Sequence, residues 1–169
     1  MRNTGNAEIS GTIRRAGNED VPAIRTMYAA AKTMPDTTWN EYYPGEEEIA
    51  ADLAAGGLYV LEENGVVVGA VTVEETDDLD ALPEFADSTV THRSICRLVI
   101  APAAQGRRLG AFFLTELFTR LHADGVEEIR LLVAKQNGAA NATYRRLGFE
   151  FVGECAMYGV DFHVCRKTL

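Results

Sequence analysis

The first apolar pattern along the chain is a stripe with the 3.6-residue period of an amphipathic helix. The stripe consists of Ile24, Met27, Tyr28 and Ala31. Pro22 suits the first turn of a helix, so we expect this helix to begin near Asp20. A short strand over residues 12–16 precedes it. A second helix is predicted to begin at the glutamates of residues 46–48, which favour the positive end of the helix dipole, and to end at Gly56.

The clearest strand pattern is a pair of apolar runs on either side of Asn64-Gly65. Leu58–Leu61 and Val66–Val73 are rich in residues that favour strands, and Asn-Gly is a turn that joins two antiparallel strands. The two runs therefore predict a β-hairpin. An acidic loop over residues 76–88 follows, and a further strand is predicted over residues 90–100.

In the second half, helical and strand patterns continue to alternate. Residues 110–123 form an amphipathic pattern with large apolar side chains on one face, which predicts a helix. A strand over residues 129–134, a helix over residues 139–147 and a final hairpin with strands at 149–157 and 162–167 follow. The predicted order is βααβββαβαββ, which indicates a mixed α/β fold around one sheet.

The length and the composition of the chain indicate a single domain. The chain has 169 residues, of which 47% are apolar and 24% are charged. We expect a loose N-terminal arm over residues 1–10 and one domain over residues 11–169. No apolar run reaches the roughly 18 residues needed to cross a bilayer, and the first residues lack a signal-peptide core. The sequence therefore predicts a soluble, cytoplasmic protein without a membrane partner.

The three cysteines fit a reducing compartment, because their number is odd and none lies in a C-x-x-C pair. If the final hairpin is tight, Cys155 and Cys165 could face each other and hold a metal or a redox pair. The favoured interpretation is that these thiols are buried and inert, and no metal site is expected.

The charge is divided unevenly along the chain. Residues 1–90 carry a balance of −13 and residues 91–169 a balance of +4, which together give the net charge of −9. An acidic half attracts a cation or an amine, and a basic half attracts a polyanion. A solvated acidic surface that serves only solubility is the alternative. The overall charge disfavours a nucleic-acid partner.

A candidate anion site follows the strand at residues 90–100. The segment Gln105-Gly106-Arg107-Arg108-Leu109-Gly110 links this strand to a helix, so backbone N–H groups and the helix dipole can converge on a phosphate. The segment lacks the Gly-Lys-Ser/Thr of a Walker A loop and the G-x-G-x-x-G of a dinucleotide fold. A plain strand-to-helix turn with surface arginines is the alternative.

A second block has the spacing N-x-x-A-x-x-x-Y-x-x-x-G-F. Its residues are Asn137, Ala140, Tyr144, Gly148 and Phe149. With the first block, it resembles the GNAT superfamily of N-acetyltransferases, whose motif Q/R-x-x-G-x-G/A is matched by Gln105 and Gly110. The chain departs from that motif at Arg108, which replaces the middle glycine and must take a backbone conformation that glycine adopts more freely. The segment with Trp39 and Tyr43-Pro44, ahead of the second predicted helix, also resembles the corresponding segment of many small bacterial members.

The resemblance implies a mostly antiparallel sheet flanked by helices and a direct transfer of acetyl from acetyl-CoA to an amine. Both ligands would bind at a V-shaped opening between two central strands. Backbone groups of Leu98, Val99 and Ile100 would pair with the pantetheine arm, and an N–H near Val99 would polarise the thioester carbonyl. Asn137 would bind the cofactor arm or align its helix. The loop residues expected to bind the cofactor are Gln105, Gly106, Arg107, Arg108, Gly110 and Ala111.

Tyr144 is the expected general acid. It lies seven residues beyond Asn137, so it faces the same opening, where it would contact the cofactor and protonate the departing thiolate. A tyrosine packed on the sheet is the alternative. The general base is open among Glu74, Glu75, His92 and a water held by backbone carbonyls. We favour Glu74 or Glu75 because a carboxylate also attracts a cationic amine, although strand alternation sends the two to opposite faces.

The acceptor would contact aromatic residues between the first two helices. Trp39 and Tyr43, with Tyr42 between them, could hold an alkylammonium by cation–π contact, or the rings could close the core. We expect transfer to a primary amine of a small molecule. A protein N-terminal or lysine acetyltransferase and a non-catalytic acetyl-CoA sensor are the alternatives. A homodimer also stays open, since dimers are common in the superfamily.

Overall fold

The computed structural model describes residues 9–169, so most of the expected N-terminal arm, residues 1–8, lies outside the described residues. The elements are β1 (Thr12–Arg15), α1 (Val21–Ala31), α2 (Glu46–Ala55), β2 (Leu58–Glu63), β3 (Val66–Glu74), β4 (His92–Ile100), α3 (Leu109–Ala123), β5 (Glu128–Ala134), α4 (Gly138–Arg146), β6 (Glu150–Met157) and β7 (Val160–Thr168). This order confirms the predicted fold class. Short 3₁₀ helices at Asn18–Asp20, Asp78–Ala81 and Pro102–Ala104 add to it. No helix described between residues 9 and 169 is long and apolar enough to cross a membrane.

Left-handed residues make the predicted turns. Asn64 and Gly65, with φ of 52° and 77°, join β2 to β3 as the sequence predicts. Tyr158 and Gly159, with φ of 55° and 74°, join β6 to β7, so β7 begins two residues before the predicted Phe162.

The expectation that the thiols of Cys155 and Cys165 could face each other is wrong. The hairpin register places Cys155 opposite Phe162 and Cys165 opposite Phe151. Cys165 is fully buried, whereas Cys155 is partly exposed. Because the strands are paired from Met157 and Val160 onward, the two cysteines are separated along the ladder and cannot form a pair across it.

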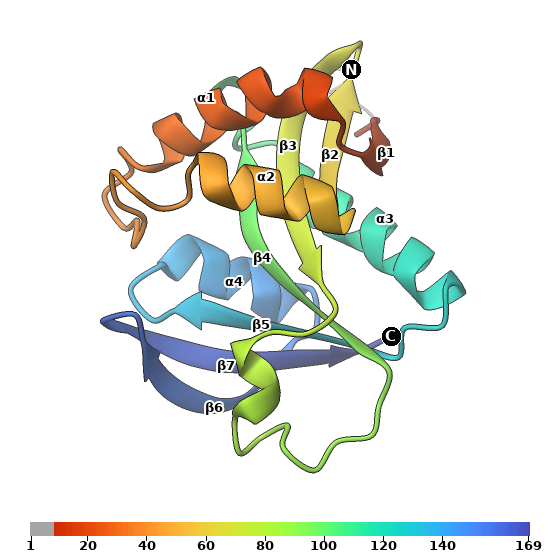
Figure 1. The fold of residues 1–169 in the computed structure, drawn as a ribbon, viewed down its shortest axis with the longest axis vertical. Helices are drawn as coiled ribbons and strands as arrows, with labels where there is room; N and C mark the ends of the chain where they lie inside the picture. Colours follow the sequence, from red (N-terminus) through yellow and green to blue (C-terminus); the bar gives the residue numbers. More distant parts are fainter. Residues whose placement is uncertain (1–8) are drawn as a thin grey trace, which may run out of the picture.

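The seven strands form one sheet in the order β1-β2-β3-β4-β5-β7-β6, and every neighbouring pair except β4 and β5 is antiparallel. The parallel pair is short: it runs from His92 opposite Glu128 to Ser94 opposite Arg130. Beyond these residues the two strands diverge, as Figure 1 shows. The sheet therefore opens at its centre.

Apolar side chains cover both faces of the sheet. Val60 and Ala70 pack with Ile24 and Ile49 of the α1–α2 layer, whereas their neighbours Leu61 and Val71 pack with α3 and α4. This alternation follows from the two-residue period of a strand, which sends successive side chains to opposite faces. Figure 1 shows α1 and α2 in front of β2, β3 and β4, with α3 behind them. The sheet thus separates the α1–α2 layer from the layer of α3 and α4.

A β-bulge interrupts β4 near this opening. Ala70 of β3 pairs with Val99, but Thr72 pairs with Cys96, so β4 carries one extra residue. Arg97 lies in the bulge with a left-handed φ of 51°. Bulges bend a strand and redirect a side chain. Here the bulge turns the Arg97 side chain toward Asp52 of α2.

The acidic loop between β3 and β4 is fixed to the sheet by a buried arginine. Arg130 of β5 is 1% exposed and donates to Glu128 at 2.7 Å and to Ser88 at 2.9 Å. Its guanidinium also lies 4.1 Å from the centre of the Phe85 ring. Asp80 of the loop accepts a 2.7 Å hydrogen bond from His92. These contacts hold the loop over the place where β4 and β5 pair.

We expect Arg130→Ala to lower the free energy of unfolding by about 3–5 kcal/mol, because it leaves Glu128 buried without a cation. Arg166→Ala is the matched control: Arg166 meets Glu150 at 3.4 Å on the surface, and such pairs contribute about 1 kcal/mol or less. Urea denaturation measures both. Equal, small losses for the two variants would contradict a role for Arg130 as the anchor of the loop.

Candidate functional site

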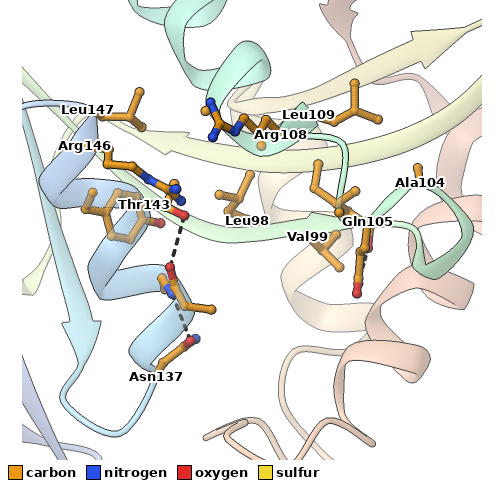
Figure 2. Close-up of a pocket in the computed structure, with 17 residues that line it drawn as sticks. Leu98, Val99, Ala104, Gln105, Arg108, Leu109, Asn137, Thr143, Arg146 and Leu147 are labelled. Atoms are coloured by element: carbon orange, nitrogen blue, oxygen red, sulfur yellow. Dashed lines mark hydrogen bonds between the residues drawn. The ribbon is translucent and has the colours of Figure 1, made fainter. Parts of the chain in front are cut away.

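A cleft of about 510 Å³ occupies the opening between β4 and β5. Figure 2 shows its lining, which comes from three parts of the chain. They are the end of β4 with Leu98, Val99 and Ile100, the segment from Ala104 to Ala111 except Arg107, and one face of α4 with Asn137 ahead of it. The two sequence blocks, which are about 30 residues apart, therefore form opposite walls of one cleft.

The β4 wall offers a free strand edge. One edge of β4 pairs with β3 up to Ile100, but the other edge pairs with β5 only as far as Ser94. Backbone groups of Leu98, Val99 and Ile100 on that edge consequently face the cleft without a strand partner from β5. An extended ligand with amide groups can bind there as an added strand.

The second wall is the loop that leads into α3. Gln105 donates from Nε2 to the Ile100 carbonyl at 3.0 Å, which fastens the loop to the end of β4. Gly106 and Arg108 have φ of 79° and 58°, so both are left-handed. Arg108 is the N-cap of α3, and Gly110 and Ala111 in its first turn line the cleft. The first N–H groups of a helix have no intrahelical partner, so this wall can bind an anion.

The two adjacent arginines of the loop have different surroundings. The side chain of Arg108 lies in the cleft, as Figure 2 shows. Arg107 does not line it: its guanidinium donates to Glu63 at 2.9 Å, at the end of β2. The structure thus brings Gln105, Gly106, Arg108, Gly110 and Ala111 together at the cleft and leaves Arg107 outside.

Arg146 is a cleft residue that sequence reasoning missed. It lies in the last turn of α4, and Figure 2 shows its side chain in the cleft with that of Arg108 on the opposite wall. The available signal was a positive charge on the helix that borders the opening, three residues after Thr143 and so on the same face. Two cations from two walls strengthen the attraction for an anion.

Tyr144 both borders the opening and packs against the core, which are the two placements that the sequence left open. Its ring packs edge-on against Phe149 at 5.4 Å inside the apolar cluster of α3, yet the residue also lines the cleft. It is 9% exposed. Burial raises the pKa of Tyr144 well above its ordinary value, so its hydroxyl stays protonated at neutral pH. A buried phenol at a cleft wall can donate a proton.

Asn137 shapes the wall that carries Tyr144. Its side-chain oxygen accepts from the Ala140 backbone N–H at 3.1 Å, which caps α4. Asn141 donates to the carbonyls of Ala134 and Asn137 at 2.9 and 2.7 Å and ties the helix to the end of β5. Asn137 therefore lines the cleft and aligns α4.

A buried ionic cluster lies on the α2 side of β4. Arg97, 10% exposed, donates to both carboxylate oxygens of Asp52 at 3.0 and 2.8 Å, to Glu74 at 2.9 Å and to the Tyr43 hydroxyl at 3.0 Å. Thr72 donates to Asp52 at 2.6 Å. We call Tyr43, Asp52, Thr72, Glu74 and Arg97 the Arg97 cluster. Burial opposes the charge of Arg97, but its partners outweigh this and raise its pKa above the ordinary value.

Two predicted site residues meet in the Arg97 cluster, namely Glu74 and Tyr43. Glu75 points elsewhere: it is exposed and accepts from Arg93 at 2.7 Å. Sequence reasoning missed Arg97 and Asp52, although each is a charge inside an otherwise apolar segment, which was the available signal. Their meeting depends on the bulge of β4, which no local pattern predicts.

The remaining candidates lie apart from the cluster. His92 contacts Asp80 and the Val90 carbonyl in the anchored loop. Trp39 packs edge-on against Tyr28 at 5.4 Å in the α1–α2 core. Tyr42 is 83% exposed. Of the three aromatic residues between the first two helices, only Tyr43 contacts the ionic groups through a hydrogen bond in the described residues.

The family model described as acetyltransferase (GNAT) family matches residues 22–149. A related protein, the L-methionine sulfoximine/L-methionine sulfone acetyltransferase of Salmonella typhimurium strain LT2, is 28% identical over 156 residues, which cover 89% of this chain and 86% of that protein. A second relative, the mycothiol acetyltransferase of Mycolicibacterium gilvum, is 40% identical over 90 residues, which cover 48% of this chain and 30% of that protein.

Solved structures share the fold. An acetyltransferase of the GNAT family from Streptococcus agalactiae superposes with a TM-score of 0.80 at 20% identity, covering 94% of this chain and 95% of its own. The acetyltransferase yncA from Salmonella typhimurium, solved with acetyl-CoA, gives a TM-score of 0.71 at 22% identity over 95% of this chain and 94% of its own.

Proposed function

The chain belongs to the acetyltransferase (GNAT) family, and from this premise we propose that it is an N-acetyltransferase that moves acetyl from acetyl-CoA to a primary amine of a small molecule, by direct transfer within a ternary complex. The observation that carries the proposal is the cleft where β4 and β5 diverge. One wall suits a diphosphate, the β4 edge suits an amide chain, and a protonated phenol lies on the third side.

The cleft fits the parts of acetyl-CoA. Arg108 and Arg146 would bind the diphosphate together with the first N–H groups of α3. The free edge from Leu98 to Ile100 would pair with the amides of the pantetheine arm, and Asn137 would border that arm. The bound cosubstrate supplies the activated acetyl group as a thioester. Arg107, held by Glu63, is left out of this proposal.

The protein groups would then move the protons of the reaction. Glu74 would accept a proton from the acceptor ammonium, so that the neutral amine attacks the carbonyl carbon while the C–S bond breaks. Tyr144 would donate its hydroxyl proton to the departing sulfur, and its phenolate would then take the second proton from the attacking nitrogen, which leaves a neutral amide. A backbone N–H near Val99 would stabilise negative charge on the carbonyl oxygen. Both glutamates accept from an arginine, but Glu74 is 30% exposed and lies in the Arg97 cluster beside Tyr43, whereas Glu75 is 75% exposed, so Glu74 is preferred.

The class of acceptor is supported by the relatives. The names of the matching proteins from Salmonella typhimurium and Mycolicibacterium gilvum refer to small molecules, methionine sulfoximine and mycothiol. Release of free thiol from acetyl-CoA, measured against a panel of amino acids, polyamines, aminoglycosides and peptides, tests the proposal. Release with small amines supports it. Turnover confined to peptides would favour the protein-acetylating alternative, and coenzyme binding without thiol release would favour a sensor.

Tyr144→Phe is expected to lower kcat by about 10²–10³-fold with little change in the Kd of acetyl-CoA, because the ring keeps its packing and only the proton donor is lost. Since burial raises the pKa of Tyr144, the wild-type acid form persists as pH rises, and kcat should show no alkaline decline from this group below about pH 10. Stopped assays with thiol detection across pH measure this. An unchanged kcat would remove the acid role.

Arg108→Gln is expected to weaken the binding of CoA by about tenfold, because a hydrogen bond between charged groups contributes at least about 1.5 kcal/mol. The binding of dephosphorylated pantetheine, which has no phosphate, should hardly change. Arg107→Gln is the matched control and should leave both affinities nearly unchanged, since Arg107 pairs with Glu63. Calorimetry at two salt concentrations measures both variants. Equal losses for CoA and pantetheine would argue against phosphate contact.

A further inference from the structure

The charge of Arg107 is directed away from a cleft that its neighbours line. Gly106 and Arg108, on either side of it in the chain, both line the cleft. Consecutive Cα atoms are only about 3.8 Å apart, and an arginine side chain is longer than this, so Arg107 lies within reach of the same space. Its Nη2 atom nevertheless donates to Glu63 Oε1 at 2.9 Å, at the end of β2. One cation of the loop is therefore withheld from the cleft.

The two cations inside the cleft have different surroundings. Arg108 and Arg146 extend into it from opposite walls, as Figure 2 shows, and within residues 9–169 neither forms an ion pair with a carboxylate. Their charges are available to an anion. Arg107 is 45% exposed, and in the same range Glu63 is the one group that accepts a hydrogen bond from its guanidinium. Glu63 is thus what distinguishes Arg107 from the other two arginines.

The pair of Glu63 and Arg107 is not arranged to stabilise the fold. The Glu63 side chain is only 16% exposed, and its Oε2 atom is buried without a hydrogen-bond partner in the described part of the chain. A carboxylate that loses its water and gains a single partner contributes little, because desolvation offsets the attraction between the charges. The exposure of Arg107 weakens that attraction further. The position of Glu63 therefore supports a role toward Arg107 rather than toward stability.

We infer that Glu63 is a positioning residue, which neutralises Arg107, holds its guanidinium away from the cleft and thereby limits the affinity of the cleft for CoA. This inference rests on the proposed function, because it concerns the cosubstrate of the same cleft. The Glu63 carboxylate and a phosphate group are alternative partners of Arg107. Loss of the carboxylate adds a third cation to a site that already has Arg108 and Arg146.

A limited affinity for CoA favours release of the product. CoA keeps its diphosphate when the acetyl group leaves, so each phosphate contact that binds acetyl-CoA binds the product equally and gives no advantage to the chemical step. Differences in affinity among variants of one site appear mainly in the rate of dissociation. By withholding Arg107, Glu63 therefore speeds the departure of CoA, while Arg108 and Arg146 still bind the cosubstrate.

Glu62 provides a matched control for the removal of a carboxylate. It precedes Glu63 in β2, is 31% exposed and accepts from Arg14 at 2.9 Å. Arg14 also pairs with Asp20 at 2.7 Å, so it keeps a carboxylate when Glu62 is replaced. Glu62→Gln therefore removes the same charge from the neighbouring position and leaves Arg107 paired.

A double-mutant cycle tests the inference by calorimetry with CoA. The cycle consists of the wild type, Glu63→Gln, Arg107→Gln and the variant with both changes. Glu63→Gln should tighten the binding of CoA by about three- to tenfold, because it adds one charge-assisted contact to phosphate. The double variant should lose this gain, whereas Arg107→Gln alone should leave the affinity nearly unchanged. An effect of Arg107 that depends on Glu63 is the coupling that the inference requires.

Three further readouts separate this role from a structural one. Dephosphorylated pantetheine should bind the wild type and Glu63→Gln equally, because it has no phosphate. The gain with CoA should shrink when the salt concentration is raised to about 0.5 M, since ions screen exposed charges. The midpoint of thermal unfolding of Glu63→Gln should stay within about 3 °C of the wild type or rise, because the lost pair contributes little to stability. Glu62→Gln should leave the affinity for CoA nearly unchanged.

The inference is overturned if Glu63→Gln leaves the affinity for CoA unchanged or weakens it, or if the double variant keeps the gain. It is also overturned if Glu62→Gln gives an equal gain, or if pantetheine gains as much as CoA does. A larger fall in the unfolding midpoint of Glu63→Gln would show that the pair serves the fold, and would overturn it too. Failure of the proposed function looks different: CoA would bind with the expected pattern, yet no amine would release thiol from acetyl-CoA.

Discussion

The short parallel contact between β4 and β5 determines the site. Three residue pairs, from His92 to Ser94, join the two halves of the sheet, and the strands then separate. A longer ladder would close the cleft and use the backbone groups of β4 internally, since buried N–H and C=O groups need partners. Separation leaves that edge free while α3, α4 and the apolar clusters keep the two halves together. The cleft therefore exists because the pairing of β4 with β5 ends at Ser94.

Strand β4 contributes residues both to the cleft and to the Arg97 cluster. Leu98 and Ile100 line the cleft, whereas Arg97 reaches α2 on the other side, the side on which Val99 packs. Because of the bulge, Ile95 packs with α3 instead, although it lies two residues before Arg97. A regular strand would keep a strict two-residue alternation. The extra residue adds an ionic group on the α2 side without disturbing the cleft. The proposed cosubstrate cleft and the Arg97 cluster therefore lie on opposite sides of β4 and use separate side chains.

Local patterns in the sequence predicted the elements well because those elements depend on local chemistry. Asn64-Gly65 forms its turn whatever surrounds it, and the periodicity of residues 110–123 requires a helix with one buried face. The Arg97 cluster was not predicted, because it joins Asp52 and Arg97 across 45 residues through a bulge. Arg146 was missed for a similar reason, since its role depends on the angle at which α4 borders the cleft.

Arg107 and Arg108 illustrate why neighbouring residues of one type need separate treatment. The sequence assigns both to the same anion site, as charge and spacing alone would suggest. Arg108, whose backbone is left-handed, lies with its side chain in the cleft, whereas Arg107 pairs with Glu63 outside it. A conformation that costs free energy in an L-residue is thus retained where it aims a cation at the cleft. Glycine at this position would adopt the left-handed backbone at a lower free-energy cost, but it would supply no charge. The departure from the family motif therefore costs conformational free energy and adds a second cation opposite Arg146.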